Sequence, residues 1–237
     1  TISYGVCALY IMYFFISKKS ILKVKLNCFK LKLNLVTEIS SLGSVTLIRQ
    51  AMVSVTVLLV NNILFVLGGE SAITVYAIIS RMLMFASFPI FGITQGFLPI
   101  AGYNYGAKNW ERVRASIKTS IKYASILATF VLIIIIFFSE SIPEVFSDNL
   151  DVSQQTPIAL RYVFMALPIV GIQLIGSAYF QAIGKAKPAL LLTLSRQGFF
   201  FIPLLFSLPL FYGVFGVWLA FPIADLLATI VLSLIHI

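Results

Sequence analysis

Charged residues are sparse in seven long apolar stretches of this 237-residue sequence, which hold at most two each, and short polar segments separate those stretches. They cover residues 1–17, 41–67, 72–101, 117–139, 157–183, 188–211 and 214–235. All but the first exceed the ~20 residues that a helix needs to cross a hydrocarbon core of ~30 Å. The charged fraction is 11%, against ~25% in an ordinary soluble domain. The pattern predicts an all-α polytopic membrane protein.

Basic residues fall on alternate connections between the predicted spans. The first, third and fifth connections hold most of the 17 Lys and Arg residues, whereas the second and fourth hold Glu70 and the group Glu140, Glu144, Asp148 and Asp151. The positive-inside rule places the basic loops in the cytoplasm, so we expect a multi-pass protein of the cell membrane. The net charge of +9 then indicates contact with anionic lipids. Nucleic-acid binding is not expected, because the basic residues do not form one folded face.

The two ends of the sequence predict a fragment. It begins at Thr1 without an initiator Met, and Lys18 and Lys19 follow the first apolar stretch instead of preceding it, unlike a signal peptide. Residues 233–237 resemble a translated sequencing adapter, so His236 is given no role. The basic segment 18–40 has the position of a linker between two halves of a larger bundle.

Metal, disulfide and enzyme chemistry are not indicated. Cys7 lies in the first span and Cys28 in the first loop, which implies no disulfide framework. The sequence has no cluster of Cys, His and carboxylates of the kind that binds metal. An enzyme would need a nucleophile with its base, or metal ligands. We therefore expect no cofactor, no metal and no catalytic residue.

Arg196 and Asp225 lie at matching depths in the last two spans. Arg196 is about 8 residues, or ~12 Å, from the cytoplasmic end of its span, and Asp225 is about 11 residues, or ~16 Å, from the outer end of its own. Across a core of ~30 Å these depths coincide, which predicts an ion pair. The pair has two interpretations, a fixed brace between helices or a proton or cation site at Asp225 that Arg196 tunes.

Other polar residues inside the spans are candidates for a substrate or ion pathway. A charge at the bilayer centre costs about 2.5–3.5 kcal/mol on insertion scales, so Arg49 and Arg81 need partners: carbonyls, Asn or Gln, or carboxylates from outside this sequence. Arg161 is closer to a span end and is interpreted as an interface anchor. The full candidate set is Arg49, Gln50, Asn61, Arg81, Gln95, Gln173, Gln181, Arg196 and Asp225.

The third and fifth spans share a short pattern. Phe88-Pro-Ile-Phe-Gly-Ile93 recurs as Leu167-Pro-Ile-Val-Gly-Ile172. Proline removes a helical hydrogen bond and glycine loosens the turn, and Gly/Pro-interrupted spans are where transporters place binding sites and moving parts. The hinge candidates are therefore Pro89, Gly92, Pro168 and Gly171, although chance recurrence remains the alternative.

The end of the third span carries the most specific motif. Residues 95–108 read QGFLPIAGYNYGAK, whose glycines permit close helix contact and a sharp turn. This run resembles the signature of multidrug and toxic compound extrusion (MATE) transporters, in particular the branch of MepA-type bacterial exporters. Further matches are Arg49-Gln50, Asn61-Asn62, residues 195–199 with Pro203, and residues 216–225.

The resemblance implies a twelve-helix protein of two six-helix lobes. Residues 1–17 would be the truncated last helix of the N-terminal lobe, 18–40 the inter-lobe linker and 41–237 the C-terminal lobe. The family exports organic cations in exchange for Na⁺ or H⁺ by alternating access, so the implied partners are organic cations, lipids and the missing N-terminal lobe. Some members carry a carboxylate in the first helix of the second lobe; here that span offers Arg49 and Gln50 but no acid.

A second function stays open. Related transporters flip lipid-linked saccharides and usually need a cationic cavity for pyrophosphate. Arg49, Arg81 and Arg196 would supply one if they point inward.

Overall fold

In the computed structural model, residues 2–17 and 32–234 are described. The chain divides into two compact units, Thr1–Ser40 and Ser41–Ile237. The first contains α1 (Ile2–Ile16), an apolar helix of 15 residues with exposed side chains from Ser3 to Phe15. The next helix already begins at Leu33, inside the predicted linker 18–40; residues 18–31 of that linker, with Cys28, lie outside the described residues, as does His236.

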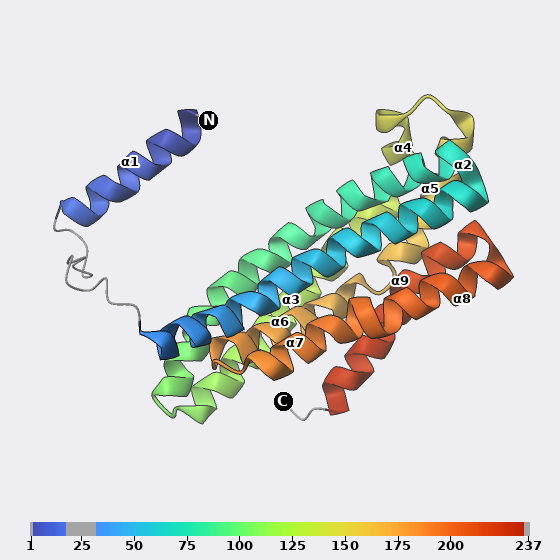
Figure 1. Cartoon of the computed structure of the whole chain (residues 1–237). Coiled ribbons are helices and arrows are strands. Elements are labelled where there is room, and N and C mark those ends of the chain that lie inside the picture. The colour runs from blue at the N-terminus through green and yellow to red at the C-terminus, as the bar shows by residue number, and fades with distance from the viewer. Residues whose placement is uncertain (1, 18–31, 235–237) are drawn as a thin grey trace. The chain divides into compact units, whose positions relative to one another are not determined.

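A helical hairpin forms the predicted second and third spans. α2 (Leu33–Gly106) is 74 residues long, and its one non-helical residue is Gly69, with φ 64° and ψ −153°. A positive φ favours glycine, which has no Cβ. Figure 1 shows the chain running along the first arm (33–68), turning, and returning along the second arm (70–106). The prediction of two spans is met because a single glycine turns the chain between them.

The remaining helices are shorter and closely connected. They are α3 (Trp110–Phe137), α4 (Ser141–Phe146), α5 (Leu150–Phe164), α6 (Leu167–Ala182), α7 (Ala186–Leu194), the π-helical segment η2 (Ser195–Phe201), α8 (Ile202–Tyr212) and α9 (Val214–Leu234). Among the described residues no segment is a strand.

The helices suited to cross a membrane nearly reproduce the predicted spans. By length and composition, four described helices qualify, or five if the bent pair α5–α6 counts as one span. α2 supplies two of the seven predicted spans, and α1 is shorter than the test requires. The predicted span 157–183 is bent near its hinge candidate Pro168, because α5 and α6 meet at an angle of 46°. Pro168 in the first turn of α6 lacks the N–H that would continue α5.

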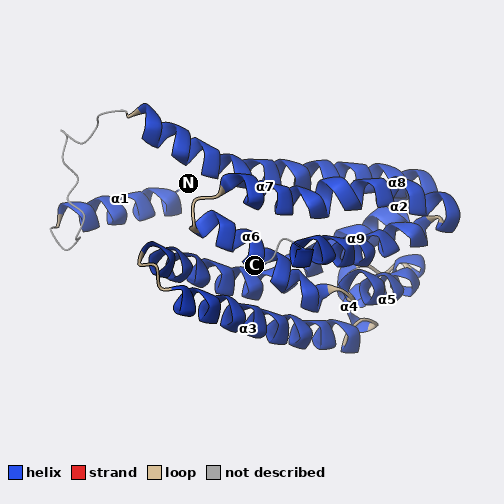
Figure 2. Cartoon of the chain, turned by 90° about the horizontal axis from the view of Figure 1, so that it is seen from below, coloured by secondary structure: helices blue, strands red, loops and turns tan. Residues whose placement is uncertain are grey.

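In the second unit, α6 and α9 form a middle layer. α6 packs against α3 on one side and α7 on the other, and α9 packs against α5, α6, η2 and α8. Figure 2 shows this order from below. At Gly171 a Cβ would lie 3.0 Å from the Cβ of Ala124, so glycine lets α6 approach α3 closely.

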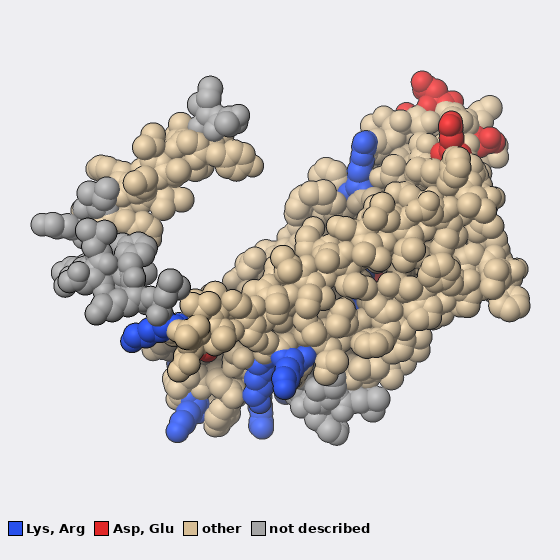
Figure 3. All heavy atoms as spheres, viewed as in Figure 1, with Lys and Arg blue, Asp and Glu red and all other residues tan. Residues whose placement is uncertain are grey.

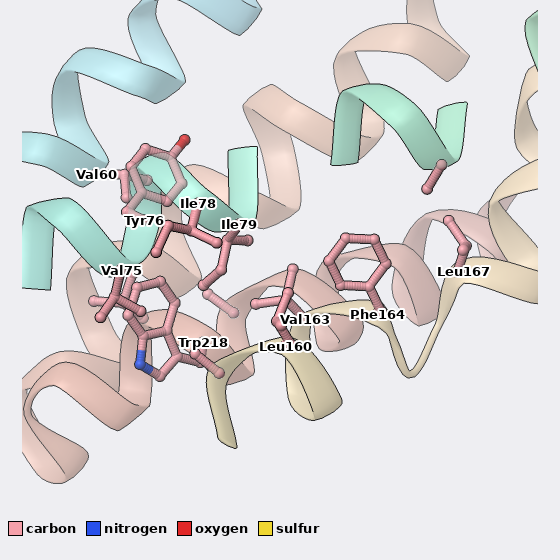
Figure 4. Close-up of a cluster of buried hydrophobic side chains, with 14 of the residues drawn as sticks. Val60, Val75, Tyr76, Ile78, Ile79, Leu160, Val163, Phe164, Leu167 and Trp218 are labelled. Atoms are coloured by element: carbon pink, nitrogen blue, oxygen red, sulfur yellow. The ribbon is translucent and has the colours of Figure 1, made fainter. Parts of the chain in front are cut away.

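The largest buried cluster lies near the Glu140–Asn149 end of the bundle. It joins both arms of α2 with α5, α6 and α9, and Figure 4 shows Val75 beside Trp218 and Ile79 beside Leu160 and Val163. Contacts of this kind hold the helices at fixed rotations, which in turn decides where the polar side chains of α6, η2 and α9 point.

Candidate functional site

The predicted ion pair between Arg196 and Asp225 is confirmed. Nε of Arg196 on η2 donates to Oδ1 of Asp225 on α9 at 2.5 Å. Asp225 is buried, with 5% of its surface exposed, whereas one third of the Arg196 side chain is exposed. Charge-assisted hydrogen bonds are the stronger class, and Asp225 is the one buried charged residue in the described part of the chain.

Gln173 holds the backbone of the same residue. Nε2 of Gln173 on α6 donates to the carbonyl oxygen of Asp225 at 2.6 Å and to Oγ1 of Thr229 at 2.8 Å. Thr229 also donates to that carbonyl at 2.7 Å. A helical carbonyl that accepts additional bonds is a sign of a polar site built across helices, so α6, η2 and α9 meet at Asp225.

The helix that carries Arg196 is locally widened. Residues Ser195–Phe201 form π-helical turns between α7 and α8. Gly198 lies inside this segment, and a Cβ there would lie 3.4 Å from Cε of Met52. Pro203 follows in the first turn of α8 and cannot donate a backbone hydrogen bond. π-Helical turns occur frequently at functional sites, and this one presents Arg196 and Gln197 together.

Two small cavities flank the ion pair. The Asp225 cavity, of about 50 Å³, is lined by Thr56, Arg196, Gln197, Phe201, Phe221, Ala224 and Asp225. The Arg49 cavity, also about 50 Å³, is lined by Arg49, Gln173, Leu174, Ser177, Leu192, Thr193, Arg196 and Gln197. Arg196 and Gln197 line both, so they form the wall between the two cavities.

Three buried polar atoms belong to residues that line these cavities. Oγ1 of Thr56, Oε1 of Gln173 and Oε1 of Gln197 have no hydrogen-bond partner among residues 2–17 and 32–234. Buried polar atoms are nearly always satisfied by protein or by ordered water. Three such oxygens around one ion pair therefore distinguish this region from the apolar remainder of the bundle.

Of the three candidates in the first arm of α2, one lies at this site. Arg49 is half-buried and lines the Arg49 cavity. Gln50 is exposed and Asn61 is half-buried, and neither lines a cavity around the ion pair. No carboxylate of the described residues pairs with Arg49, so a carbonyl, an Asn or Gln, or a carboxylate from outside this sequence stays the predicted partner.

Arg81 and Arg161 lie elsewhere. The guanidinium of Arg81, an exposed residue, is 5.5 Å from the centre of the Phe146 ring on α4, a cation–π contact that the sequence did not predict. Arg161 is exposed and bonds Glu140 at 3.1 Å. Its predicted role as an interface anchor stays a prediction.

The residues of the signature run lie at the end of the second arm. Gln95, the first residue of the run, is exposed. The candidate Gln181 lies outside the run, on α6; it is half-buried, and its Nε2 has no hydrogen-bond partner in the described chain. Gly102 approaches α6, since a Cβ there would lie 3.1 Å from the carbonyl oxygen of Ala182, as predicted for close contact. The glycines of residues 95–108 predict a sharp turn at a glycine. In the structure the residue with positive φ in this run is Lys108, at 56°.

The hinge candidates occupy different environments. The break between α5 and α6 adjoins Pro168, and Gly171 lies against α3. The backbone at Pro89 and Gly92 stays helical within α2, and open space surrounds Gly92. Of the two copies of the Pro-Gly pattern, only the one at Pro168 and Gly171 therefore lies at a break between helices.

Apart from Gln173, four uncharged members of the site lie outside the set of candidates predicted from the sequence. Thr56, Thr193, Gln197 and Thr229 carry hydroxyl or amide groups inside apolar spans, a weak signal because such residues also bond their own helix. No group of three or more His, Cys, Asp or Glu that would hold a metal occurs within the described residues.

The MatE family profile matches residues 45–207, more than half of the chain. This chain belongs to the MatE family. The resemblance to MATE transporters in residues 95–108 is thereby confirmed, and because the family consists of transporters, so is the prediction that the protein is not an enzyme.

Two curated relatives align over nearly the whole chain. The multidrug export protein MepA of Staphylococcus haemolyticus (strain JCSC1435) is 26% identical over 224 residues, 94% of this chain and 49% of that protein. Multidrug export protein MepA of Staphylococcus aureus (strain MSSA476) is 24% identical over 234 residues, 99% of this chain and 51% of that protein. The chain thus spans about half the length of these relatives.

Solved structures agree with the fold. The MATE multidrug transporter DinF-BH superposes with a TM-score of 0.87 at 32% identity, over 99% of this chain and 52% of that one. An outward-facing multidrug resistance MATE family transporter gives a TM-score of 0.92 at 24% identity, over 98% and 53%. The predicted fold, an all-α membrane protein equivalent to half of a MATE-type transporter, is confirmed.

Proposed function

We propose that this chain is the C-terminal half of an antiporter that exports drugs and other organic cations across the cytoplasmic membrane in exchange for Na⁺ or H⁺. The observation that carries the proposal is the MatE match over residues 45–207 together with relatives named multidrug export proteins. Residues 1–17 belong to the last helix of the N-terminal lobe, 18–40 to the linker and 41–237 to the C-terminal lobe. Alternating access requires both lobes, so the N-terminal lobe is the main partner.

The charge distribution supports an orientation. In Figure 3 acidic side chains gather at one end of the bundle and most basic side chains at the other. The exposed Lys108 and Lys185 lie on connections proposed to be cytoplasmic, and the exposed Arg112, Lys118 and Lys122 lie in the N-terminal half of α3 next to one of them. The positive-inside rule assigns such loops to the cytoplasm, where they contact anionic lipid headgroups.

The buried ion pair supports cation coupling. A coupling ion or proton must meet a group inside the membrane whose charge it changes. Asp225 is such a group, because its carboxylate is buried and balanced by Arg196. Gln173 and Arg196 bond Asp225, and Arg49 lines the neighbouring cavity. We include these four residues in the ion pathway.

The alternative of a lipid-linked saccharide flippase receives less support. It would need several unpaired arginines that point into one cavity. Arg196 is paired with Asp225, and Arg81 lies over Phe146. Arg49 and Arg196 line one cavity of about 50 Å³, together with uncharged residues.

The proposal is tested by ethidium efflux from cells that lack their own exporters and express the full-length protein. The proton and sodium gradients are collapsed separately. We expect efflux that stops with one gradient, which names the coupling ion. Good expression without efflux would contradict the proposal and make a lipid-linked substrate the next one to test.

A further inference from the structure

We propose that the Asp225 cavity and the Arg49 cavity hold ordered water and form a hydrated path from Arg49 to Asp225, along which Asp225 exchanges a proton. This inference rests on the proposed antiport function and deepens it: the coupling ion exchanged in this half is H⁺. The path runs between α2, α6, η2 and α9.

The polar groups around the Asp225 cavity match the bonding capacity of one water molecule. Thr56 has 8% of its surface exposed, and its hydroxyl has no partner in the described chain. A water there accepts from the Thr56 hydroxyl and donates to Oε1 of Gln197 and to the Asp225 carboxylate. Three bonds is the usual number for a buried water, which needs roughly 10–15 Å³; this cavity has about 50 Å³.

The Arg49 cavity extends the path. Its lining includes Gln173 and Gln197, each of which has a buried Oε1 without a partner in the described chain, together with Arg49 and Arg196. Ser177 and Thr193 add two hydroxyls, 3.2 Å apart. A water in this cavity therefore donates to a glutamine oxygen, and Gln197 is shared with the Asp225 cavity.

Arg49 lies at the end of the path that is in contact with bulk water. It is half-buried, and no carboxylate in the described residues pairs with it. An arginine at membrane depth faces a water-filled space or a partner, because contact with lipid tails is costly. We therefore assign its exposed side to the aqueous cleft between the two lobes, which supplies and receives protons.

A proton suits this site better than Na⁺. Arg196 already lies 2.5 Å from Oδ1 of Asp225, so a metal cation would bind beside a guanidinium. Arg196 is the one charged group of the described residues that bonds Asp225. Arg49 lines the other cavity, and Tyr76 packs against Phe221, which lies one helical turn before Asp225. The buried residues of α5, α7 and α8, and Gln173 of α6, are uncharged.

The proton step balances without any other reactant. One O–H bond forms on the Asp225 carboxylate as one breaks on the neighbouring water, and that water regains its proton from the cleft through the path. Protonated Asp225 no longer carries the charge that holds Arg196. The η2–α9 contact therefore has two states, paired and released, which is what a coupled conformational change requires.

The first test measures proton release when ethidium binds to the full-length protein in weakly buffered detergent solution with a pH dye. Wild-type protein is expected to release protons, and Asp225→Asn to release one fewer per transporter, because a carboxylate binds one proton. Glu140→Gln is the matched control: it removes an exposed carboxylate of an ion pair outside the site and is expected to behave as wild type. A folded Asp225→Asn protein with undiminished release would overturn the inference.

Variants that keep the ion pair test the path itself. Thr56→Val preserves shape but removes the hydroxyl, and Gln197→Leu removes the shared oxygen. Both are expected to slow proton release several-fold in stopped-flow measurements without changing its stoichiometry. Unchanged rates in both would overturn the path, and this test applies even if Asp225→Asn does not fold.

The outcome is separable from the proposed function. If wild-type protein exports ethidium with a sodium gradient alone and releases no protons, the antiport function stands and the inference falls. If it exports nothing, the proposed function falls as well.

Discussion

Gln173 and Arg196 hold Asp225 from two sides. Gln173 bonds its backbone carbonyl at 2.6 Å, and Arg196 bonds its carboxylate at 2.5 Å. The two bonds come from α6 and from η2, so three helical segments of the C-terminal half converge on one residue. Both interpretations of the ion pair, a brace and a coupling site, start from this geometry, and measurements of stability and of proton release together separate them.

Asp225→Asn is expected to destabilise the protein because it leaves Arg196 without its counter-charge. Breaking a buried pair costs about 3–5 kcal/mol, and since one third of the Arg196 side chain is exposed, we expect about 3 kcal/mol, the lower end of that range. Thermal unfolding of the full-length protein in detergent measures the loss.

The double variant Arg196→Gln/Asp225→Asn removes both charges and retains amides that can bond each other. We expect it to be more stable than Asp225→Asn alone, because no unpaired buried charge remains. If the double variant folds well yet loses proton release, Asp225 acts in coupling; if it behaves as wild type in both measurements, neither charge of the pair has a role in coupling.

Gly171 should tolerate no large side chain. A Cβ there would lie 3.0 Å from that of Ala124, so Gly171→Leu forces α6 away from α3 at a cost of about 1–3 kcal/mol. Gly92→Ala is the control, because open space surrounds Gly92 and alanine favours the helix by about 0.5–1 kcal/mol. Equal unfolding temperatures for Gly171→Leu and wild type would contradict the close α3–α6 contact.

Gly69 should require glycine because its φ is 64°. Gly69→Ala places a Cβ at a φ of 64° and a ψ of −153°, a conformation that essentially only glycine adopts, at a cost of roughly 1–3 kcal/mol. The helical Gly96, with open space around it, serves as control, since Gly96→Ala carries no such penalty. Unfolding temperatures that fall for both variants alike would show that the hairpin turn is not the cause.

The exposed pair Arg161–Glu140 should matter little. Its side chains are 50% and 81% exposed, and exposed pairs contribute about 0–1 kcal/mol. Glu140→Gln is therefore expected to shift the unfolding temperature much less than Asp225→Asn. A comparable loss would mean that the outer connection is held more tightly than its exposure indicates.

The charge pair could be predicted from the sequence because Arg196 and Asp225 lie at matching depths in the last two spans. A rise of 1.5 Å per residue, counted from each span end, placed Arg196 and Asp225 at one level. The bond from Gln173 was out of reach, since it depends on how α6 rotates against α9, 52 residues away. Rotation follows from packing between helices, as at Gly171, and a single sequence does not show which residues meet.

The element boundaries differ for local reasons. α2 begins at Leu33, before the predicted span start at residue 41. Its first turns mix polar and apolar residues, and a search for an apolar stretch therefore starts later than the helix does. Pro168 predicted a bend, but the same Pro-Gly spacing at Pro89 and Gly92 leaves α2 helical. A proline weakens one hydrogen bond, and the neighbouring helices decide whether the chain bends there.

The central claim is coupled export through Asp225, and ethidium transport in proteoliposomes that contain the full-length protein tests it most directly. A pH gradient is imposed at equal sodium on both sides, and wild type is compared with Asp225→Asn. The account predicts transport that follows the pH gradient in wild type and is uncoupled from it in the variant. Transport by a folded Asp225→Asn protein that still follows the pH gradient would contradict it.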